Sequence, residues 1–255
     1  MRNLNKYVGF FLMEYKRVRF YFVELVVQSL TISVRLALPY TVFLALIKTN
    51  QISQETANAM LWAVLVGQIL YGASLRLHSK IRDEIRTGDI SIRISEPVNY
   101  VLAKLSQSLG KFIPSFSIMA LIFFPILALF FPAKVNSLTL TIFTLVSFLI
   151  TNLTNIIVGL TSFLIEENDG IFYIVSKLFL IFGNQIIPVA LMPVWLIQFA
   201  KLTPFYYGLA APIEAASGRL DLLPGLLTSG VYILVLYLIT QIMLSKLRKR
   251  LILNG

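Results

Sequence analysis

The sequence lacks cysteine and has a single histidine, His78, among its 255 residues. A chain without cysteine has no disulfide, no thiolate metal ligand and no cysteine nucleophile. One histidine also excludes a metal site built from several imidazoles. Charged residues are scarce too, at 13% of the chain, whereas soluble domains contain about 25%. The composition therefore excludes disulfide-stapled folds, cysteine-dependent enzymes and histidine-rich metal sites.

Motifs for nucleotide binding and hydrolysis are absent as well. A phosphate-binding P-loop needs the pattern G-x-x-x-x-G-K-[ST]. The single Gly-Lys pair is Gly110 with Lys111, and Leu105 and Phe112 occupy the positions where the pattern needs glycine and Ser or Thr. Neither H-E-x-x-H nor G-x-S-x-G occurs. We therefore expect no catalytic residue, no metal and no cofactor in this chain, which is then not an enzyme.

Apolar residues dominate what is present. They make up 57% of the chain, and the mean hydropathy is +0.81. Since the core of a soluble domain cannot use so much apolar surface, we expect lipid to be the solvent. A hydrocarbon layer of about 30 Å takes about 20 apolar residues per helix. The sequence thus predicts a single all-α integral membrane domain with six transmembrane helices. The predicted spans are residues 21–47, 57–77, 112–131, 138–165, 171–187 and 222–244.

The N-terminal segment, residues 1–18, has apolar residues at helical spacing with basic residues between them. This pattern favours a helix that lies in the membrane interface before the first span. The alternative is a frayed basic terminus. Because no small-residue cleavage site follows its short apolar patch, we do not expect a removable signal.

Basic residues gather in alternate connections between the predicted spans. Cytoplasmic loops of membrane proteins collect Lys and Arg. With six spans, 17 of the 22 basic residues fall on one side and four on the other, while Arg35 lies within the first span. We therefore expect both termini and residues 78–97 to face the cytoplasm. The net charge of +10 is explained by this topology, so it gives no support to nucleic-acid binding.

Residues 78–97 form the one long, highly charged segment within the hydrophobic chain. Leu77, Ile81 and Ile85 recur every four residues, with charged residues on the remaining faces. Gly88 follows at a natural helix end. The pattern therefore predicts a short amphipathic helix over the first half of the segment.

The second half of this segment, residues 89–95, alternates apolar and polar side chains. Strict alternation is typical of extended chain, so we predict an extended stretch that ends before the third span. Two roles are open for residues 78–97 as a whole. The segment is either a docking site for a soluble partner or a solvated loop that packs its isoleucines against the helix ends.

The first span carries Gln28, Thr31 and Arg35 at positions i, i+3 and i+7, so these residues share one helix face. An arginine that faces lipid at mid-span costs about 2.5–3.5 kcal/mol, so Arg35 should face protein, water or an anionic group. Three explanations are open: a structural ion pair or carbonyl contact, a wall of a substrate path, or a shifted span in which Arg35 lies shallower.

The fourth span carries a stripe of small polar residues. Its members are Thr144, Ser147, Thr151, Asn155 and Ser162. Residues of this kind serve most often as hydrogen-bonding contacts between membrane helices. Lining a translocation path is the second hypothesis.

An acidic turn, residues 166–170, follows the fourth span. Its clustered carboxylates suggest a metal site. The favoured interpretation is a solvated turn in which Asp169 caps the start of the fifth span.

Five prolines between positions 188 and 224 break the chain before the last span. The apolar pieces between them are too short for another crossing. We predict a broken, re-entrant or interfacial region over residues 188–221 on the outer side, with its backbone shielded by protein. Trp195 and residues 205–207 would lie at headgroup depth.

Three segments occur in a particular order within this six-span pattern. The first is Ile85-Arg86-Thr87-Gly88-Asp89-Ile90, followed by Glu96-Pro97. The second runs from Gly183 to Pro188 and continues to Met192-Pro193. The third is Leu202-Thr203-Pro204-Phe205-Tyr206-Tyr207 with Ala211-Pro212 and Ser217-Gly218. In this order they resemble the permease subunits of ABC-type exporters, the class related to polysaccharide, drug and lipid export permeases.

The resemblance implies a mechanism and a set of partners. Two such permeases, identical or similar, would form one pathway across a cell membrane, expected to be the inner or plasma membrane of a bacterium. Each would bind a separate cytoplasmic ABC ATPase, which carries ATP and Mg²⁺. The first cytoplasmic loop would supply a coupling helix that transmits closure of the ATPases to the spans. By matching position, the coupling residues are Leu77, Ile81, Arg82, Asp83, Glu84, Ile85, Arg86, Thr87 and Gly88.

Two other functions are open. A non-catalytic channel or an assembly or anchoring protein would explain the six spans but not the ordered segments. A membrane-embedded enzyme would need clustered His, Asp or Glu within the spans, where the sequence offers little beyond Arg35 and Glu24.

Overall fold

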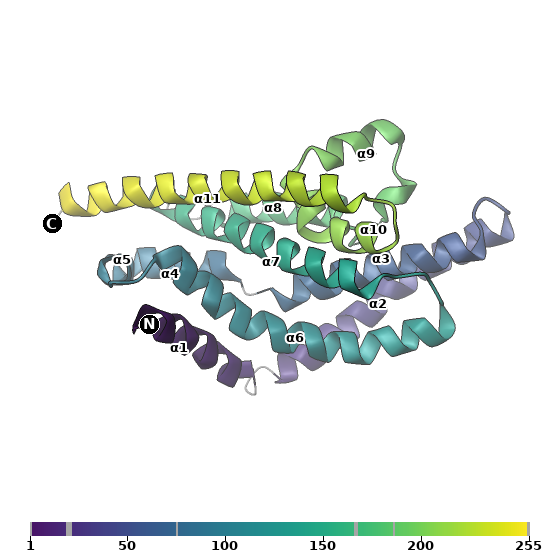
Figure 1. Ribbon diagram of the computed structural model, residues 1–255, viewed down its shortest axis with the longest axis horizontal. Helices are drawn as coiled ribbons and strands as arrows, with labels where there is room; N and C mark the ends of the chain where they lie inside the picture. The colour runs from purple at the N-terminus through teal and green to yellow at the C-terminus, as the bar shows by residue number, and fades with distance from the viewer. Residues whose placement is uncertain (1, 19–21, 75, 166–167, 186, 254–255) are drawn as a thin grey trace.

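Every regular element of the described chain is a helix (Figure 1). The computed structural model describes residues 2–18, 22–74, 76–165, 168–185 and 187–253. The long helices are α1 (Arg2–Arg17), α2 (Phe22–Lys48), α3 (Gln54–Ala73), α6 (Tyr100–Phe130), α7 (Ser137–Leu160), α8 (Asp169–Phe182) and α11 (Leu222–Leu253). The short ones are α4 (Leu77–Arg86), α5 (Asp89–Ser95), η2 (Thr161–Phe163), η3 (Val189–Leu191), α9 (Val194–Lys201), η4 (Tyr206–Ala210) and α10 (Ala211–Ala216). The predicted all-α class is confirmed.

The long helices run back and forth along one bundle (Figure 1). The N-terminus, α4, α5 and the C-terminus lie together at one end, which we call the α5 end. The turn between α2 and α3, the connection between α6 and α7, and α9 lie toward the opposite end, which we call the α9 end. This arrangement places both chain ends and the charged segment 78–97 at one end of the bundle (Figure 1). Which end faces the cytoplasm stays a prediction.

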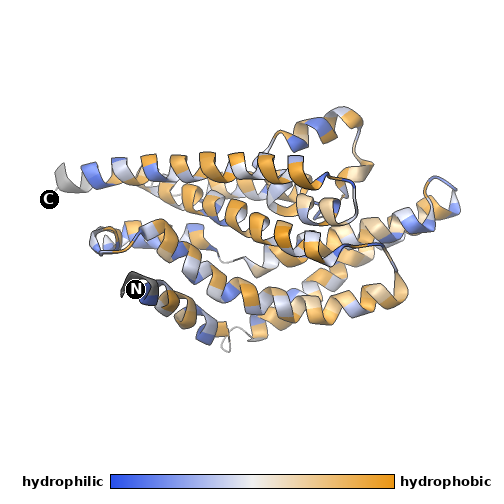
Figure 2. Ribbon diagram, viewed as in Figure 1, coloured by the Kyte–Doolittle hydropathy of each residue, from blue (hydrophilic) through white to orange (hydrophobic). Residues whose placement is uncertain are grey.

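Five helices within the described ranges are long and apolar enough to cross a membrane. The candidate spans are Val23–Lys48, Gln54–Arg86 (which takes in both α3 and α4), Tyr100–Phe130, Ser137–Phe163 and Leu222–Lys249. Hydrophobic residues predominate along these helices (Figure 2), and Val34, Leu121 and Leu129 are 73%, 75% and 79% exposed. Such surfaces are unfavourable in water and suit lipid. The structure is therefore consistent with a membrane protein.

The predicted fifth span, residues 171–187, is not one continuous helix. α8 has 14 residues, which make about 21 Å at 1.5 Å per residue and fall short of a hydrocarbon layer. The helix ends where Gly183 packs against Leu209 and where Asn184 takes a left-handed backbone with φ 57°. A sixth crossing needs α8 together with the segment that follows it, so the predicted number of six spans is not confirmed.

Two helices extend beyond the spans predicted for them. α6 begins at Tyr100 rather than near residue 112, and α11 continues to Leu253 rather than ending near residue 244. The hydrophobic pattern stops where lysines and arginines begin, but these residues continue a helix readily. Hydropathy therefore marks the apolar part of each helix and not its true end.

Residues 89–95 form helix α5, so the predicted extended stretch is wrong. Gly88 takes a φ of 79°, which ends α4 and turns the chain into α5. Ile90 and Ile94 are one helical turn apart and buried, whereas Ile92 is 66% exposed. Isoleucine at every second position therefore fits a helix when the middle isoleucine faces outward. A run of seven residues is too short to distinguish the strand period of two residues from the helix period of 3.6.

The N-terminal segment forms helix α1, which packs along α6. A Cβ on Gly110 of α6 would lie 2.3 Å from the carbonyl oxygen of Phe11, so glycine permits the close approach. Glu14 of α1 is 1% exposed and accepts a 2.6 Å bond from Lys80 Nζ of α4. The alternative of a frayed terminus is therefore wrong for the described residues 2–18, and the interfacial position remains a prediction.

Residues 188–221 are broken into short helices, as the prolines predict. Pro193 precedes α9, and Pro212 lies in the first turn of α10. Beneath them, Asn184 accepts from the backbone N–H of Val189 at 2.6 Å and donates to Glu214 Oε1 at 3.2 Å. Protein groups thus satisfy the irregular backbone, as a re-entrant or interfacial region requires.

Candidate functional site

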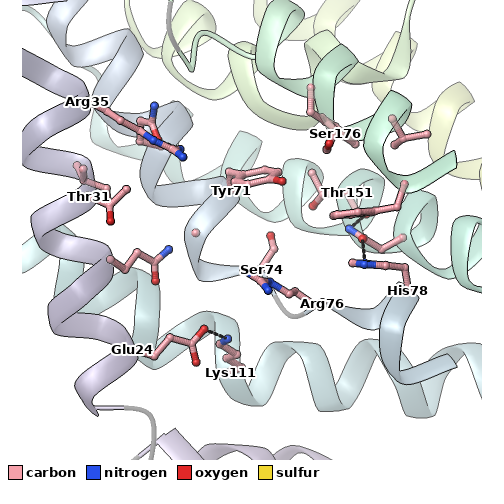
Figure 3. A pocket seen from close by; sticks show the side chains of 18 of the residues that line it. Glu24, Thr31, Arg35, Tyr71, Ser74, Arg76, His78, Lys111, Thr151 and Ser176 are labelled. Atoms are coloured by element: carbon pink, nitrogen blue, oxygen red, sulfur yellow. Dashed lines mark hydrogen bonds and ion pairs between the residues drawn. The ribbon is translucent and has the colours of Figure 1, made fainter. Parts of the chain in front are cut away.

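A polar cavity of about 430 Å³ lies among α2, α3, α4, α6, α7 and α8 (Figure 3). Helix α2 contributes Gln28, Thr31 and Arg35, and α7 contributes Thr151 and Asn155. The sequence selects all of these residues, but on two separate spans. The fold brings both polar faces to one cavity.

Arg35 is the middle residue of α2 and points into the cavity (Figure 3). Its Nη1 donates to Gln68 Oε1 of α3 at 3.2 Å. Gln68 Nε2 in turn donates to the carbonyl oxygen of Gln185. Because Gln68 is neutral, the contact orients the guanidinium without cancelling its charge. Arg35 therefore contacts the side-chain carbonyl of Gln68 and also lines the cavity. Its position in the middle of α2 argues against the shifted span in which Arg35 would lie near the membrane surface.

An ion pair links α2 to α6 beside the cavity. Lys111 Nζ donates to Glu24 Oε1 at 2.9 Å (Figure 3). One turn further along α2, Gln28 lies over Gly72 of α3, where a Cβ would be 1.5 Å from Gln28 Nε2. A Cβ at this position would require the Gln28 amide to move, so Gly72 leaves room for Gln28 to lie between α2 and α3.

His78 connects α4 to α7 and α8 on the cavity wall. Its Nδ1 lies 3.3 Å from Asn155 Oδ1, and its ring stacks on Phe172 with centroids 3.5 Å apart. Asn155 Nδ2 donates to the carbonyl oxygen of Thr151 at 2.9 Å. The histidine is thus held by an amide and an aromatic ring, both of which line the same cavity.

The other half of the α7 stripe faces a different neighbour. Thr144 and Ser147 are buried, and Ser147 Oγ donates to the carbonyl oxygen of Gly208 in η4. A Cβ on Gly208 would lie 2.6 Å from Phe179 Cε1, so the π-helical turn approaches its neighbours closely. This half of the stripe serves as a contact between helices, which is the common role of such residues.

The hairpin formed by α4 and α5 buries the apolar face that the sequence suggests for a partner. Leu77 and Ile81 are both fully buried. Ile81 packs on Gly159 of α7, where a Cβ would lie 2.8 Å from Ile81 Cβ. This burial fits the alternative in which residues 78–97 pack their isoleucines against the helix ends, and coupling to an ATPase through this segment stays a prediction. Ile85 is half-buried.

Charged side chains of α4 hold the hairpin to the bundle. Arg82 Nη1 donates to Asp169 Oδ1 of α8. Glu84 Oε2 accepts from Tyr100 Oη at 2.8 Å, and Glu84 Oε1 accepts from Lys104 Nζ. These contacts join α4 to α8 and α6 in addition to the α7 contact of Ile81. Arg82 and Glu84, two of the four charged residues among the predicted coupling residues, are thus bound to other helices.

The rest of the hairpin faces away from the bundle. We call this surface the exposed tip, and it consists of Asp83, Arg86, Thr87, Gly88, Asp89, Ile92 and Arg93. Four of these residues are among the predicted coupling residues. Ile92 is not among them, because the alternation of residues 89–95 predicts an extended stretch there. Single exposed isoleucines are common on protein surfaces, so Ile92 offers one apolar contact beside the charged residues rather than an apolar patch.

The acidic turn is described only from residue 168 onward, and Glu166 and Glu167 lie outside the described residues. Asn168 occupies the N-cap of α8, and its Nδ2 donates to the carbonyl oxygen of Val158 at 2.7 Å. Asp169 is the first helical residue, so the prediction that it caps the helix is wrong. In the part of the chain that the structure describes, no group of three or more His, Cys, Asp or Glu is arranged to hold a metal.

Several cavity residues are not selected by the sequence argument. They are Gln68, Tyr71, Arg76 and Lys111. A glutamine in the middle of an apolar span is itself a signal for a functional or packed interior position, so Gln68 could have been found. In the sequence, Arg76 contributes only to the count of basic residues, and Lys111 to that count and to the incomplete P-loop match. Neither observation places a residue in a cavity.

Comparison with protein-family models, with curated proteins and with solved structures finds no match. The resemblance to export permeases therefore remains a prediction. The geometry itself defines a polar cavity within a bundle of apolar helices and an exposed charged hairpin at one end. Such an arrangement can hold a polar group among membrane helices and can be contacted by a soluble protein.

Proposed function

We propose that the chain is the permease subunit of an ATP-driven ABC-type exporter and forms half of a translocation pathway. The ordered segments at Ile85–Ile90, 183–193 and 202–218 motivate the proposal. One structural observation carries it: the α4–α5 hairpin presents an exposed tip while its inner face is bound to the helices that line the cavity. A partner that moves the tip would move the cavity walls.

The contacts that would transmit such a movement lie on three helices. Ile81 packs on α7 at Gly159, and Arg82 binds α8 through Asp169. Glu84 binds α6 through Lys104, a nearly buried side chain. Because packed elements move as units rather than deform continuously, displacement of α4 would shift α6, α7 and α8 together.

The partners and location follow from the same proposal. A separate cytoplasmic ABC ATPase supplies ATP and Mg²⁺, and this chain carries no catalytic residue or cofactor of its own. A second copy, or a similar permease, completes the pathway in the cell membrane of a bacterium. The exposed tip and both termini face the cytoplasm, and α8 with residues 183–188 makes the sixth crossing.

The absence of cysteine makes the topology directly measurable. We would introduce Ser91→Cys at the α5 end, Ser245→Cys in α11 and Lys134→Cys at the α9 end, each exposed in the structure. A membrane-impermeant maleimide applied to intact cells should label position 134 but neither 91 nor 245. Labelling of only one of positions 91 and 245 would show that the chain crosses the membrane an odd number of times between them. That result would contradict the six-crossing arrangement.

Recruitment of the ATPase is tested by gentle purification of the tagged chain from its native host. We expect a soluble ATPase at about one copy per chain. Ile92→Asp should remove it, because the substitution puts a charge on the one large apolar residue of the exposed tip. Ser245→Asp adds the same charge at the α5 end on α11 and should leave the complex intact.

Two results would count against the export proposal. A clean preparation without any ATPase in mild detergent would favour a non-catalytic channel or an assembly or anchoring protein. Retention of the ATPase by the Ile92→Asp variant would show that the ATPase does not bind through the exposed tip. Ile81 is less informative for this test, since Ile81→Asp would bury a charge against α7.

A further inference from the structure

Cations outnumber carboxylates on the cavity wall. Among the described residues, Arg35, Arg76 and Lys111 line the cavity, and Glu24 is the one acidic residue that does so. Glu24 is already engaged by Lys111 at 2.9 Å. Within the described ranges, no salt bridge involves Arg35 or Arg76. Two guanidinium groups at the cavity therefore have no carboxylate partner among the described residues.

Guanidinium groups favour a particular kind of ligand. Each presents planar N–H donors that match the oxygens of a phosphate or a similar oxyanion, and such charge-assisted bonds are stronger than neutral ones. Arg35 donates through Nη1 to the neutral Gln68, which fixes its position and leaves its other donors for a ligand. Tyr71 lies between Arg35 and Arg76 in Figure 3 and adds a hydroxyl group.

Apolar side chains complete the cavity and extend beyond it. Ile32 and Phe179 line it from α2 and α8. Val27 of α2 lines it as well and is 56% exposed, and on α8 Ile174 is 62% exposed. A ligand held by the arginines would therefore lie beside apolar helix surfaces. This combination suits a molecule with an anionic head and an apolar body better than a small soluble ion.

We propose that the cavity binds the phosphate-type headgroup of an anionic amphiphile, with Arg35 and Arg76 on the head and the apolar body along α2 and α8. The inference rests on the proposed export function for its physiological meaning, because it names the class of molecule that would be carried. The binding itself requires no ATPase. It can therefore be tested on the purified chain alone.

The test measures lipid binding to the full chain in detergent micelles by native mass spectrometry. The probes are phosphatidic acid, phosphatidylcholine of the same acyl chains, and inorganic phosphate. We expect phosphatidic acid to bind at least tenfold more tightly than phosphatidylcholine. Arg35→Gln and Arg76→Gln should each weaken the binding of phosphatidic acid about tenfold, and the double variant should weaken it about a hundredfold. Losses of this size are expected when charge-assisted hydrogen bonds are removed.

Matched controls separate a specific site from general attraction of anions. Lys48→Gln with Lys134→Gln removes two positive charges toward the α9 end and should leave binding unchanged. Arg35→Lys keeps the positive charge but loses the planar N–H donors. It should therefore bind phosphatidic acid more tightly than Arg35→Gln but less tightly than the unchanged chain. If Arg35→Gln reduces the folded fraction in a thermal melt, Arg76→Gln carries the test, because Arg76 is exposed and its side chain makes no salt bridge with another described residue.

Each outcome decides one point. Equal binding of the two lipids, or equal loss in the lysine control, would overturn the headgroup site while leaving the export proposal standing. Tight binding of inorganic phosphate alone would show a soluble anion as the ligand and would overturn the amphiphile. Selective lipid binding by a chain that recruits no ATPase would support the site and count against export.

Discussion

Gly159 of α7 lies directly against Ile81 of α4, so closely that a Cβ on the glycine would be 2.8 Å from the isoleucine Cβ. The same Cβ would be 3.1 Å from the backbone of His78. The contact places the root of the charged hairpin against a helix that also lines the polar cavity. It therefore joins the base of the α4–α5 hairpin to α7, while His78 of α4 itself lines the cavity.

Gly159→Ala should destabilise the protein. The added methyl group must displace either Ile81 or the backbone of α4, and overpacking of this kind costs about 1–3 kcal/mol of the free energy of unfolding. Thermal unfolding in detergent would show a lower midpoint. Gly230→Ala in α11 is the matched control, because its Cβ would meet no atom within 4 Å. An equal change for both substitutions would contradict the close packing.

The ion pair between Glu24 and Lys111 should show measurable coupling. Glu24→Gln, Lys111→Gln and the double variant form a cycle, and we expect an interaction energy of about 1 kcal/mol, within the range for contacting residues. The lysine side chain is 7% exposed, so water screens the pair only in part. The pair between Arg93 and Glu96, 3.7 Å long and partly exposed, is the control and should give almost none. An interaction energy equal to that of the control pair would show that Glu24 and Lys111 do not stabilise the contact between α2 and α6.

Glu84→Gln should loosen α4 from α6. The carboxylate of Glu84 accepts from Tyr100 and from Lys104, and its loss leaves a nearly buried lysine without that carboxylate. We expect a loss of about 1–3 kcal/mol in the free energy of unfolding. Asp83→Asn on the neighbouring position, which is 65% exposed, should change it by less than about 0.5 kcal/mol. Chemical denaturation of both variants measures the difference, and a larger effect at Asp83 would contradict the contact.

The two tryptophans report the depth of the α9 region. Trp62 of α3 is 7% exposed and donates through Nε1 to the carbonyl oxygen of Phe131 at 2.9 Å, whereas Trp195 of α9 is 68% exposed. In lipid nanodiscs, the fluorescence of Trp195 in the Trp62→Phe variant should be quenched strongly by lipids brominated near the headgroup. Trp62 in the Trp195→Phe variant should be quenched weakly. Quenching of Trp195 by aqueous acrylamide but not by lipid would place α9 in water.

Hydrophobic patterning alone predicts the helical class and the regions of the membrane-length helices. Long apolar runs have few alternatives, because lipid admits only structures that satisfy their own backbone hydrogen bonds. The polar faces of the first and fourth spans are also visible in the sequence. Arg35 and Asn155 do line a cavity, since a polar residue in an apolar span is costly unless it faces protein or water.

What the sequence by itself determined is thus the all-helical class, where charge gathers and which span faces are polar. Tertiary structure alone decided which neighbour covers each face. It buried Leu77 and Ile81 against α7, exposed Ile92 on a helix, and placed Gln68 and Arg76 at the cavity. The reason is physical: periodicity reports that a helix has an apolar side, but the contact across Gly159 joins residues far apart in the chain, and only the packed bundle brings them together.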